Sequence, residues 1–193
     1  MFELHIETRK RFFNKISKYN TIEELYNDLS ILIENSTQEF SFEKISNDIK
    51  NTSGANIKYE NSENDVIVAR IYTYSAAEEL MSDTSWCIRN STIFWNKYIG
   101  GVDVYNSQYI IYNFNVPKYD QMSMVGITVE KDGSINTAHK RNDKRIYDED
   151  LFEFMNSLNI PKTVLEPLSK SEIKEKKDFY ESLDTFKNNY YDN

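Results

Sequence analysis

Apolar residues near the start of the chain recur at the spacing of an amphipathic helix. In residues 20–35, leucine and isoleucine side chains share one helical face, and Thr21 opens a capping box. A second, weaker helix follows with Ser41 as its N-cap and ends before Gly54. The pattern therefore predicts that the chain opens with two helices.

The hydrophobic period changes to two over about residues 56–140. β-branched and aromatic residues alternate there with polar ones, in short runs separated by Asn, Asp, Ser and Gly, which is typical of strands joined by turns. Asp132 and Gly133 accept the positive φ of a tight hairpin turn, so the last two strands are expected to be antiparallel. The runs are ANIKYE, DVIVARIYTY, QYIIYNFNV, SMVGITVE and SINTAHK.

Two short helical patterns interrupt these strands. SAAEELM has Ser75 as its expected N-cap, and STIFWNKYIGG begins at Ser91. Between them, the alternation in SWCI indicates a strand in which Trp86 and Cys87 point to opposite faces of the sheet. Beyond the last strand the pattern is helical again, with Asp148 as the expected cap of the first of two helices.

These elements predict an α+β fold, with a central antiparallel sheet (about residues 56–140) flanked by N-terminal and C-terminal helices. A chain of 193 residues is expected to form a single domain, 1–193. Within it we expect a helical N-terminal part (1–54), a sheet core (55–145) and a helical C-terminal part (146–193).

Charge and cysteine content narrow the classes of function. The net charge of −8 argues against binding to DNA or anionic membranes driven by whole-molecule charge. The single cysteine forms no internal disulfide, and the sequence has no zinc-site spacing, secretory signal or transmembrane run. It also has no phosphate-binding loop or glycine-rich nucleotide fingerprint. We therefore expect a cytoplasmic protein without a metal, a cofactor or a membrane partner.

Cys87, His139 and Asp143 form one candidate catalytic set. They are the residue types of a cysteine-dependent hydrolase or transferase, in which a thiolate is the nucleophile, a histidine the base and a carboxylate its orienting partner. Asp143 follows His139 by four residues and reaches it if the chain turns between them. The alternatives are a buried, inert cysteine and a histidine that bonds backbone at a strand end.

The segment after His139 is unusually basic for an acidic protein. Nearby strands carry tyrosines whose rings offer stacking faces, so a nucleotide or nucleic acid is a conceivable ligand. An exposed turn made soluble by its cations is the alternative. The cations are Lys140, Arg141, Lys144 and Arg145, and the tyrosines are Tyr72, Tyr74, Tyr109 and Tyr112.

Trp86 and Trp95 are both expected in the core or at its rim, because a helix folding back onto its sheet is typically anchored by such aromatic residues. Exposed aromatic and basic side chains suit a protein interface. The expected ligand- or partner-binding residues are Trp86, Trp95, Tyr109, Tyr112, Lys140, Arg141, Lys144 and Arg145.

A run of motifs over about residues 65–145 resembles a group of poorly characterised proteins encoded by tailed bacteriophages. The motifs are SWCI before FWNKYIGG, the tyrosine-rich QYIIYNF, SMVGITV, a KDG turn and TAHKRND. The resemblance implies a phage origin and a shared domain, with no reaction attached.

The first prediction is therefore a phage-encoded accessory protein that acts in the host cytoplasm by binding a host factor, for example in counter-defence, without catalysis. The second is a cysteine-dependent hydrolase or transferase that uses Cys87, His139 and Asp143. The third is a nucleotide or nucleic-acid binder that uses the basic segment 140–145.

Overall fold

The computed structural model describes residues 21–22 and 40–191, with side chains described as far as residue 182. The chain divides into two compact units, Met1–Phe40 and Ser41–Asn193, and the second contains the sheet. The helix expected in residues 20–35 lies almost entirely outside the described residues. The expectation of one domain over the whole chain stays a prediction.

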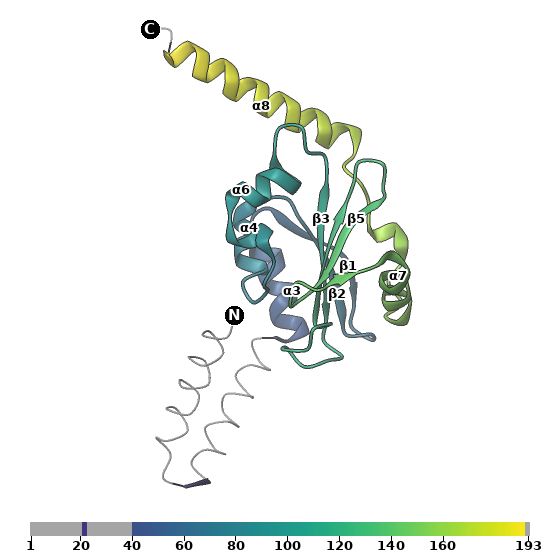
Figure 1. Ribbon diagram of the computed structural model, residues 1–193. Helices are drawn as coiled ribbons and strands as arrows, with labels where there is room; N and C mark the ends of the chain where they lie inside the picture. Colours follow the sequence, from purple (N-terminus) through teal and green to yellow (C-terminus); the bar gives the residue numbers. More distant parts are fainter. Residues whose placement is uncertain (1–20, 23–39, 192–193) are drawn as a thin grey trace. The chain divides into compact units, whose positions relative to one another are not determined.

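The described part of the chain contains a six-stranded sheet in which every neighbouring pair is antiparallel. The strand order follows the sequence, so the sheet is a meander (Figure 1). Its strands are β1 (Ala55–Asn61), β2 (Val66–Ile71), β3 (Ser107–Asn113), β4 (Met124–Val129), β5 (Ile135–Lys140) and β6 (Arg145–Ile146). The predicted α+β fold with a central antiparallel sheet is confirmed.

Helices cover both faces of the sheet. In Figure 1, α3 and the helices between β2 and β3 lie on one side, whereas α7 lies on the other. The first group is α3 (Phe42–Asn51), α4 (Tyr74–Leu80), α5 (Cys87–Asn90), α6 (Thr92–Trp95) and the π-helix η1 (Asn96–Gly100). The C-terminal elements are α7 (Asp148–Ser157), the 3₁₀ helix η2 (Lys162–Val164) and α8 (Lys170–Tyr191).

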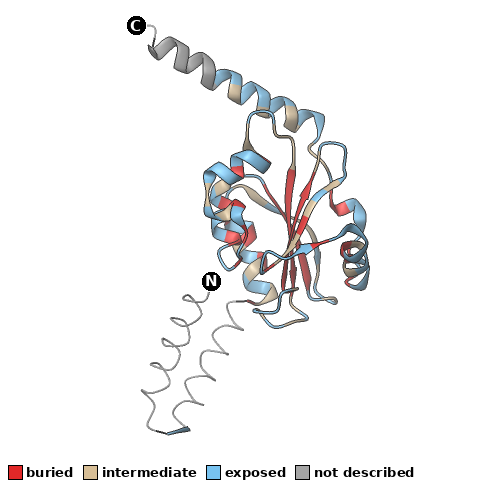
Figure 2. Cartoon of the chain, viewed as in Figure 1, coloured by how far each residue is buried: buried red, intermediate tan, exposed pale blue. Residues whose placement is uncertain are grey.

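Burial on both faces explains why the central strands are so apolar. Side chains at alternate positions of β2, β3 and β4, including Val68, Ile111 and Ile127, pack with Leu151 and Met155 of α7 in one hydrophobic cluster. The intervening side chains point to the other face and are also buried, so β2, β3 and β4 are buried along their whole length (Figure 2).

Several local predictions are confirmed. Ser41 caps α3, and its Oγ accepts a hydrogen bond from the Lys44 backbone N–H at 3.3 Å. Ser91 caps α6, where its Oγ accepts a bond from the Ile93 N–H at 3.2 Å. Gly133 has φ of 88° in the turn between the antiparallel strands β4 and β5. Local chemistry was sufficient for these three features.

Three other local predictions are wrong. The N-cap of α4 is Thr73, whose Oγ1 accepts from the Ala76 N–H at 3.2 Å, and Ser75 lies inside the helix. Both residue types cap helices well, so the sequence does not choose between them. Asp148 is the first residue of α7 and not its cap, because Tyr147 occupies that position without a side-chain bond. SWCI forms no strand, since a helix begins at Cys87.

Candidate active site

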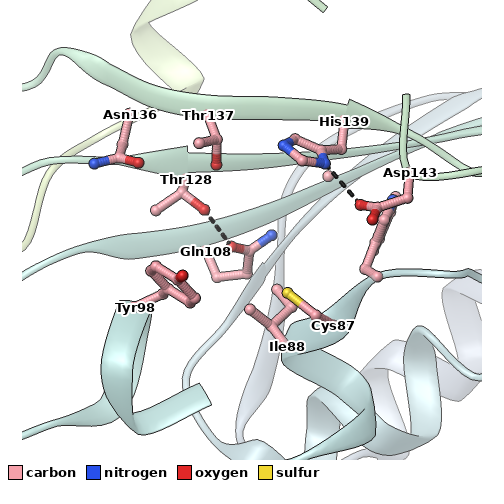
Figure 3. A pocket seen from close by; sticks show the side chains of 11 residues that line it. Cys87, Ile88, Tyr98, Gln108, Thr128, Asn136, Thr137, His139 and Asp143 are labelled. Atoms are coloured by element: carbon pink, nitrogen blue, oxygen red, sulfur yellow. Dashed lines mark hydrogen bonds and ion pairs between the residues drawn. The ribbon is translucent and has the colours of Figure 1, made fainter. Parts of the chain in front are cut away.

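A pocket opens on the sheet face that α3 to η1 cover. Its floor comes from β3, β4 and β5, and its opposite wall comes from the segment that enters α5 and from η1 (Figure 3). The sheet contributes Gln108, Gly126, Thr128, Thr137 and His139. The helical side contributes Trp86, Cys87, Ile88 and Tyr98. Asn136 and Asp143 complete the lining.

His139 and Asp143 form a hydrogen-bonded pair at the edge of this pocket. His139 Nδ1 lies 2.7 Å from Asp143 Oδ1, which confirms the predicted contact. Asp143 has φ of 64° in the turn between β5 and β6, a left-handed conformation that aspartate tolerates better than most residues. Because a carboxylate only accepts hydrogen bonds, Nδ1 carries the proton in the neutral imidazole, and Nε2 is left as the basic nitrogen.

Cys87 is exposed and lines the same pocket. The interpretation of this cysteine as a small buried hydrophobe is therefore wrong. Its Sγ makes no hydrogen bond to any residue that the structure describes, so within the pocket only His139 and Asp143 are directly joined among the three predicted catalytic residues. Catalytic contacts are often long in a ligand-free site and shorten when substrate binds.

Trp86 holds the segment that carries Cys87 against the strand that carries His139. The indole ring lies over Gly126, where a Cβ atom would be only 3.0–3.1 Å from three ring carbons. The indole N–H donates to the carbonyl oxygen of Lys140 at 2.7 Å, and the Ser85 N–H donates to that of Arg141 at 3.1 Å. The residue before Cys87 is thus tied to the residue after His139.

Trp86 is wrongly predicted to lie on a partner-binding surface, because it is only 3% exposed; as a ligand-binding residue it stays a prediction, since it lines the pocket. The same correction applies to Trp95, which is buried and makes an edge contact with the ring of Tyr74 at 6.5 Å between centroids. Both tryptophans belong to the core, as the other prediction for them stated.

Tyr109 and Tyr112 are also buried and unable to contact a partner. The Tyr109 hydroxyl donates to the Glu166 carbonyl at 2.7 Å, and the Tyr112 hydroxyl donates to the Leu80 carbonyl at 2.9 Å. Burial raises the pKa of Tyr109 to about 12 and raises the pKa of Tyr112 as well. Helices on both faces of the sheet cause this burial, which tyrosine-rich strands alone do not reveal.

The basic segment does not form one cationic surface. Arg141 is buried, and its Nη1 donates to the Lys118 carbonyl at 2.5 Å. Its Nη2 lies 3.7 Å from Asp83 Oδ2, and loss of solvent lowers the pKa of the guanidinium. Lys144 and Arg145 are exposed, and Lys140 is half-buried. Arg141 is therefore wrongly predicted as a phosphate-gripping residue.

Gln108 lines the pocket and is not among the predicted site residues. It is 1% exposed, and its Oε1 accepts a hydrogen bond from Thr128 Oγ1 at 2.8 Å. A glutamine at an inward position of the otherwise apolar run QYIIY was the signal that could have identified it.

Neither a metal centre nor a membrane span is found in the described residues. No group of His, Cys, Asp and Glu side chains there is arranged to hold a metal ion. Within the same ranges, no helix is both long and apolar enough to cross a bilayer.

Comparison with known proteins identifies no relative of this chain. No protein-family model, curated protein or solved structure matches the chain significantly. The resemblance to a bacteriophage protein group therefore stays a prediction, and the case for a function depends on the pocket itself.

Proposed function

We propose that the chain is a cysteine-dependent hydrolase or transferase, with Cys87 as nucleophile, His139 as base and Asp143 as the group that orients the histidine. One observation carries this proposal. Cys87 of α5 meets His139 and Asp143 of the β5–β6 hairpin in one open pocket, and the latter two are already joined by a 2.7 Å hydrogen bond.

The arrangement assigns a chemical role to each side chain. The thiol proton moves from Cys87 Sγ to Nε2 of His139, because the thiolate and not the thiol is the nucleophile. Asp143 holds the imidazole in the tautomer that accepts this proton and stabilises the imidazolium that forms. An exposed sulfur gives a substrate direct access to the nucleophile.

Alkylation by iodoacetamide tests this role, because Cys87 is the only cysteine in the chain. We expect Cys87 to react near neutral pH faster than the thiol of glutathione, and His139→Ala to slow the reaction at least about tenfold. Asp143→Asn should slow it as well, since the carboxylate no longer fixes the tautomer. Lys144→Ala, which changes an exposed cation of the same turn, is the matched control.

If Cys87 reacts no faster than glutathione, or if His139→Ala leaves its rate unchanged, the histidine does not activate the thiol. Circular dichroism of each variant shows whether the fold is intact.

A second candidate function is binding of a protein partner, which for a bacteriophage protein would be a host factor. The observation that favours it is a set of exposed apolar side chains beside the pocket, on α6 and η1. Ile93 is 75% exposed and Phe94 42%, and the ring of Phe94 stacks on that of Tyr98 with centroids 6.4 Å apart.

If this second candidate is right, the wild-type protein captures a partner in a pulldown, and Phe94→Ser does not. Phe179→Ser, at a phenylalanine of α8 that is 57% exposed, is the control that should retain it. Equal capture by all three proteins, or capture by none, would contradict binding through α6 and η1.

A further inference from the structure

Gln108 lies on the pocket floor in a row of polar side chains that crosses the sheet. It pairs with Thr128 of β4, which in turn pairs with Thr137 of β5. The next row on this face contains Gly126 and His139, about 7 Å further along the strands. In Figure 3, Gln108 lies between Thr128 and Cys87, with its amide directed into the pocket.

Two hydrogen bonds hold the Gln108 amide in one orientation. Oε1 accepts from Thr128 Oγ1 at 2.8 Å, and Nε2 donates to the Tyr109 carbonyl oxygen at 3.0 Å. Because a carbonyl oxygen only accepts, the atom that faces Tyr109 is the nitrogen, which excludes the flipped amide.

The Gln108 amide has one donor left. A primary amide nitrogen carries two hydrogens, and the single bond to Tyr109 uses one of them. No acceptor for the second hydrogen lies among the residues that the structure describes. A buried donor that is fixed in orientation and lines a pocket beside a thiol is suited to stabilise developing negative charge.

We infer that Gln108 is the oxyanion donor of the site, and that the substrates are therefore carboxylic acyl compounds: esters, thioesters or amides. This inference rests on the proposed function, since it needs Cys87 as the nucleophile.

The reaction balances with water, or another nucleophile, as its one further reactant. Cys87 Sγ forms a bond to the carbonyl carbon, and the π electrons of the carbonyl move to its oxygen. The negatively charged oxygen then accepts a hydrogen bond from the Gln108 N–H. When the carbonyl re-forms, the leaving group departs with its bonding electron pair and takes the proton from His139 if it is basic. The resulting thioester is released by water or another nucleophile, which restores the thiol.

A purely structural Gln108 would behave differently. In that case the amide only satisfies Thr128 and the Tyr109 carbonyl, and its loss would disturb every reaction of Cys87 equally. An oxyanion donor instead affects only those reactions in which a carbonyl oxygen gains charge.

Two probes of the same sulfur separate these roles. p-Nitrophenyl acetate acylates a thiolate through a tetrahedral oxyanion, whereas iodoacetamide alkylates it at a saturated carbon without one. We expect Gln108→Met to lower the rate of nitrophenolate release about 100-fold while the alkylation rate changes less than about twofold. Ser107→Ala is the control, because the buried Ser107 Oγ has no hydrogen-bond partner in the described structure and points to the opposite face.

The outcomes distinguish the inference from the proposed function. If Cys87→Ala leaves nitrophenolate release unchanged, or if His139→Ala leaves alkylation unchanged, the proposed function fails. If both tests succeed but Gln108→Met leaves the two rates unchanged, or lowers them equally, only the inference fails. Should Gln108→Met not fold, Gln108→Asn retains an amide but withdraws it by one methylene, and the same comparison of the two rates decides.

Discussion

The indole nitrogen of Trp86 lies 2.7 Å from the carbonyl oxygen of Lys140 and donates a hydrogen bond to it. This bond joins two segments 54 residues apart and connects the neighbours of Cys87 and His139. A second bond, from the Ser85 N–H to the Arg141 carbonyl, runs beside it at 3.1 Å. One side-chain bond and one backbone bond between neighbouring residues therefore fix the Cys87 segment against the His139 strand.

Replacing Trp86 with phenylalanine is expected to loosen the site. Trp86→Phe retains an aromatic ring over Gly126 but leaves the Lys140 carbonyl without this donor, at a cost of about 1–3 kcal/mol in unfolding free energy. We also expect iodoacetamide alkylation of Cys87 to become slower. Urea denaturation and thiol labelling measure the two effects, and unchanged values of both would contradict the assigned role.

Gly126 is expected to tolerate no side chain. In Gly126→Ala the new Cβ would lie 3.0–3.1 Å from three carbons of a buried indole ring, so ring and strand must separate. We expect a loss of about 1–3 kcal/mol in urea denaturation. A stability of Gly126→Ala equal to that of the wild-type protein would contradict this packing.

Arg141 is expected to stabilise the fold and not to bind phosphate. Arg141→Gln leaves the Lys118 carbonyl and Asp83 without the guanidinium, and we expect a loss of about 2–3 kcal/mol. Lys144→Gln, at an exposed cation of the same segment, should change stability by less than about 0.5 kcal/mol. Chemical denaturation compares the two variants, and the opposite order would show that Arg141 is free for a ligand.

Tyr109 is expected to make the fold sensitive to alkali. Its pKa in the folded protein is about 12, whereas an unfolded tyrosine titrates near pH 10. Below pH 10 both states bind the proton, and the stabilisation is fully present. As the pH rises from 10 to 12 the unfolded chain releases its proton first, so unfolding free energy should fall by up to about 1.4 kcal/mol per pH unit.

Comparison of the wild-type protein with Tyr109→Phe isolates this effect from other alkaline titrations. Phenylalanine loses the hydroxyl bond to Glu166 and starts from a lower stability, but its decline between pH 10 and 12 should be shallower. Parallel curves for the two proteins in urea denaturation would show that Tyr109 is not the group responsible.

The strands and the start of α3 were predictable because they depend on neighbours in sequence. Short β-branched and aromatic runs between turn residues identify β1 to β5, and the Ser41 cap or the positive φ of Gly133 follows from residues only a few positions away. The predicted contact between His139 and Asp143 also depends on near neighbours in sequence, because four residues and one turn separate the pair.

The site as a whole was not predictable in this way. SWCI alternates like a strand, yet a helix begins at Cys87, and the residue before it packs on Gly126 and bonds to Lys140. Tyr109 and Arg141 are residue types common on binding surfaces, but α7 and the loop that carries Lys118 bury them.

By itself, the sequence of this protein determined an antiparallel sheet between helices and a histidine–aspartate pair, because short-range periodicity and turn chemistry specify both. Only the tertiary structure decided that Cys87 is exposed in a pocket with that pair and that the Gln108 amide faces the same space. The physical reason is that hydrogen bonds and packing contacts between distant segments determine which side chains are covered and which meet.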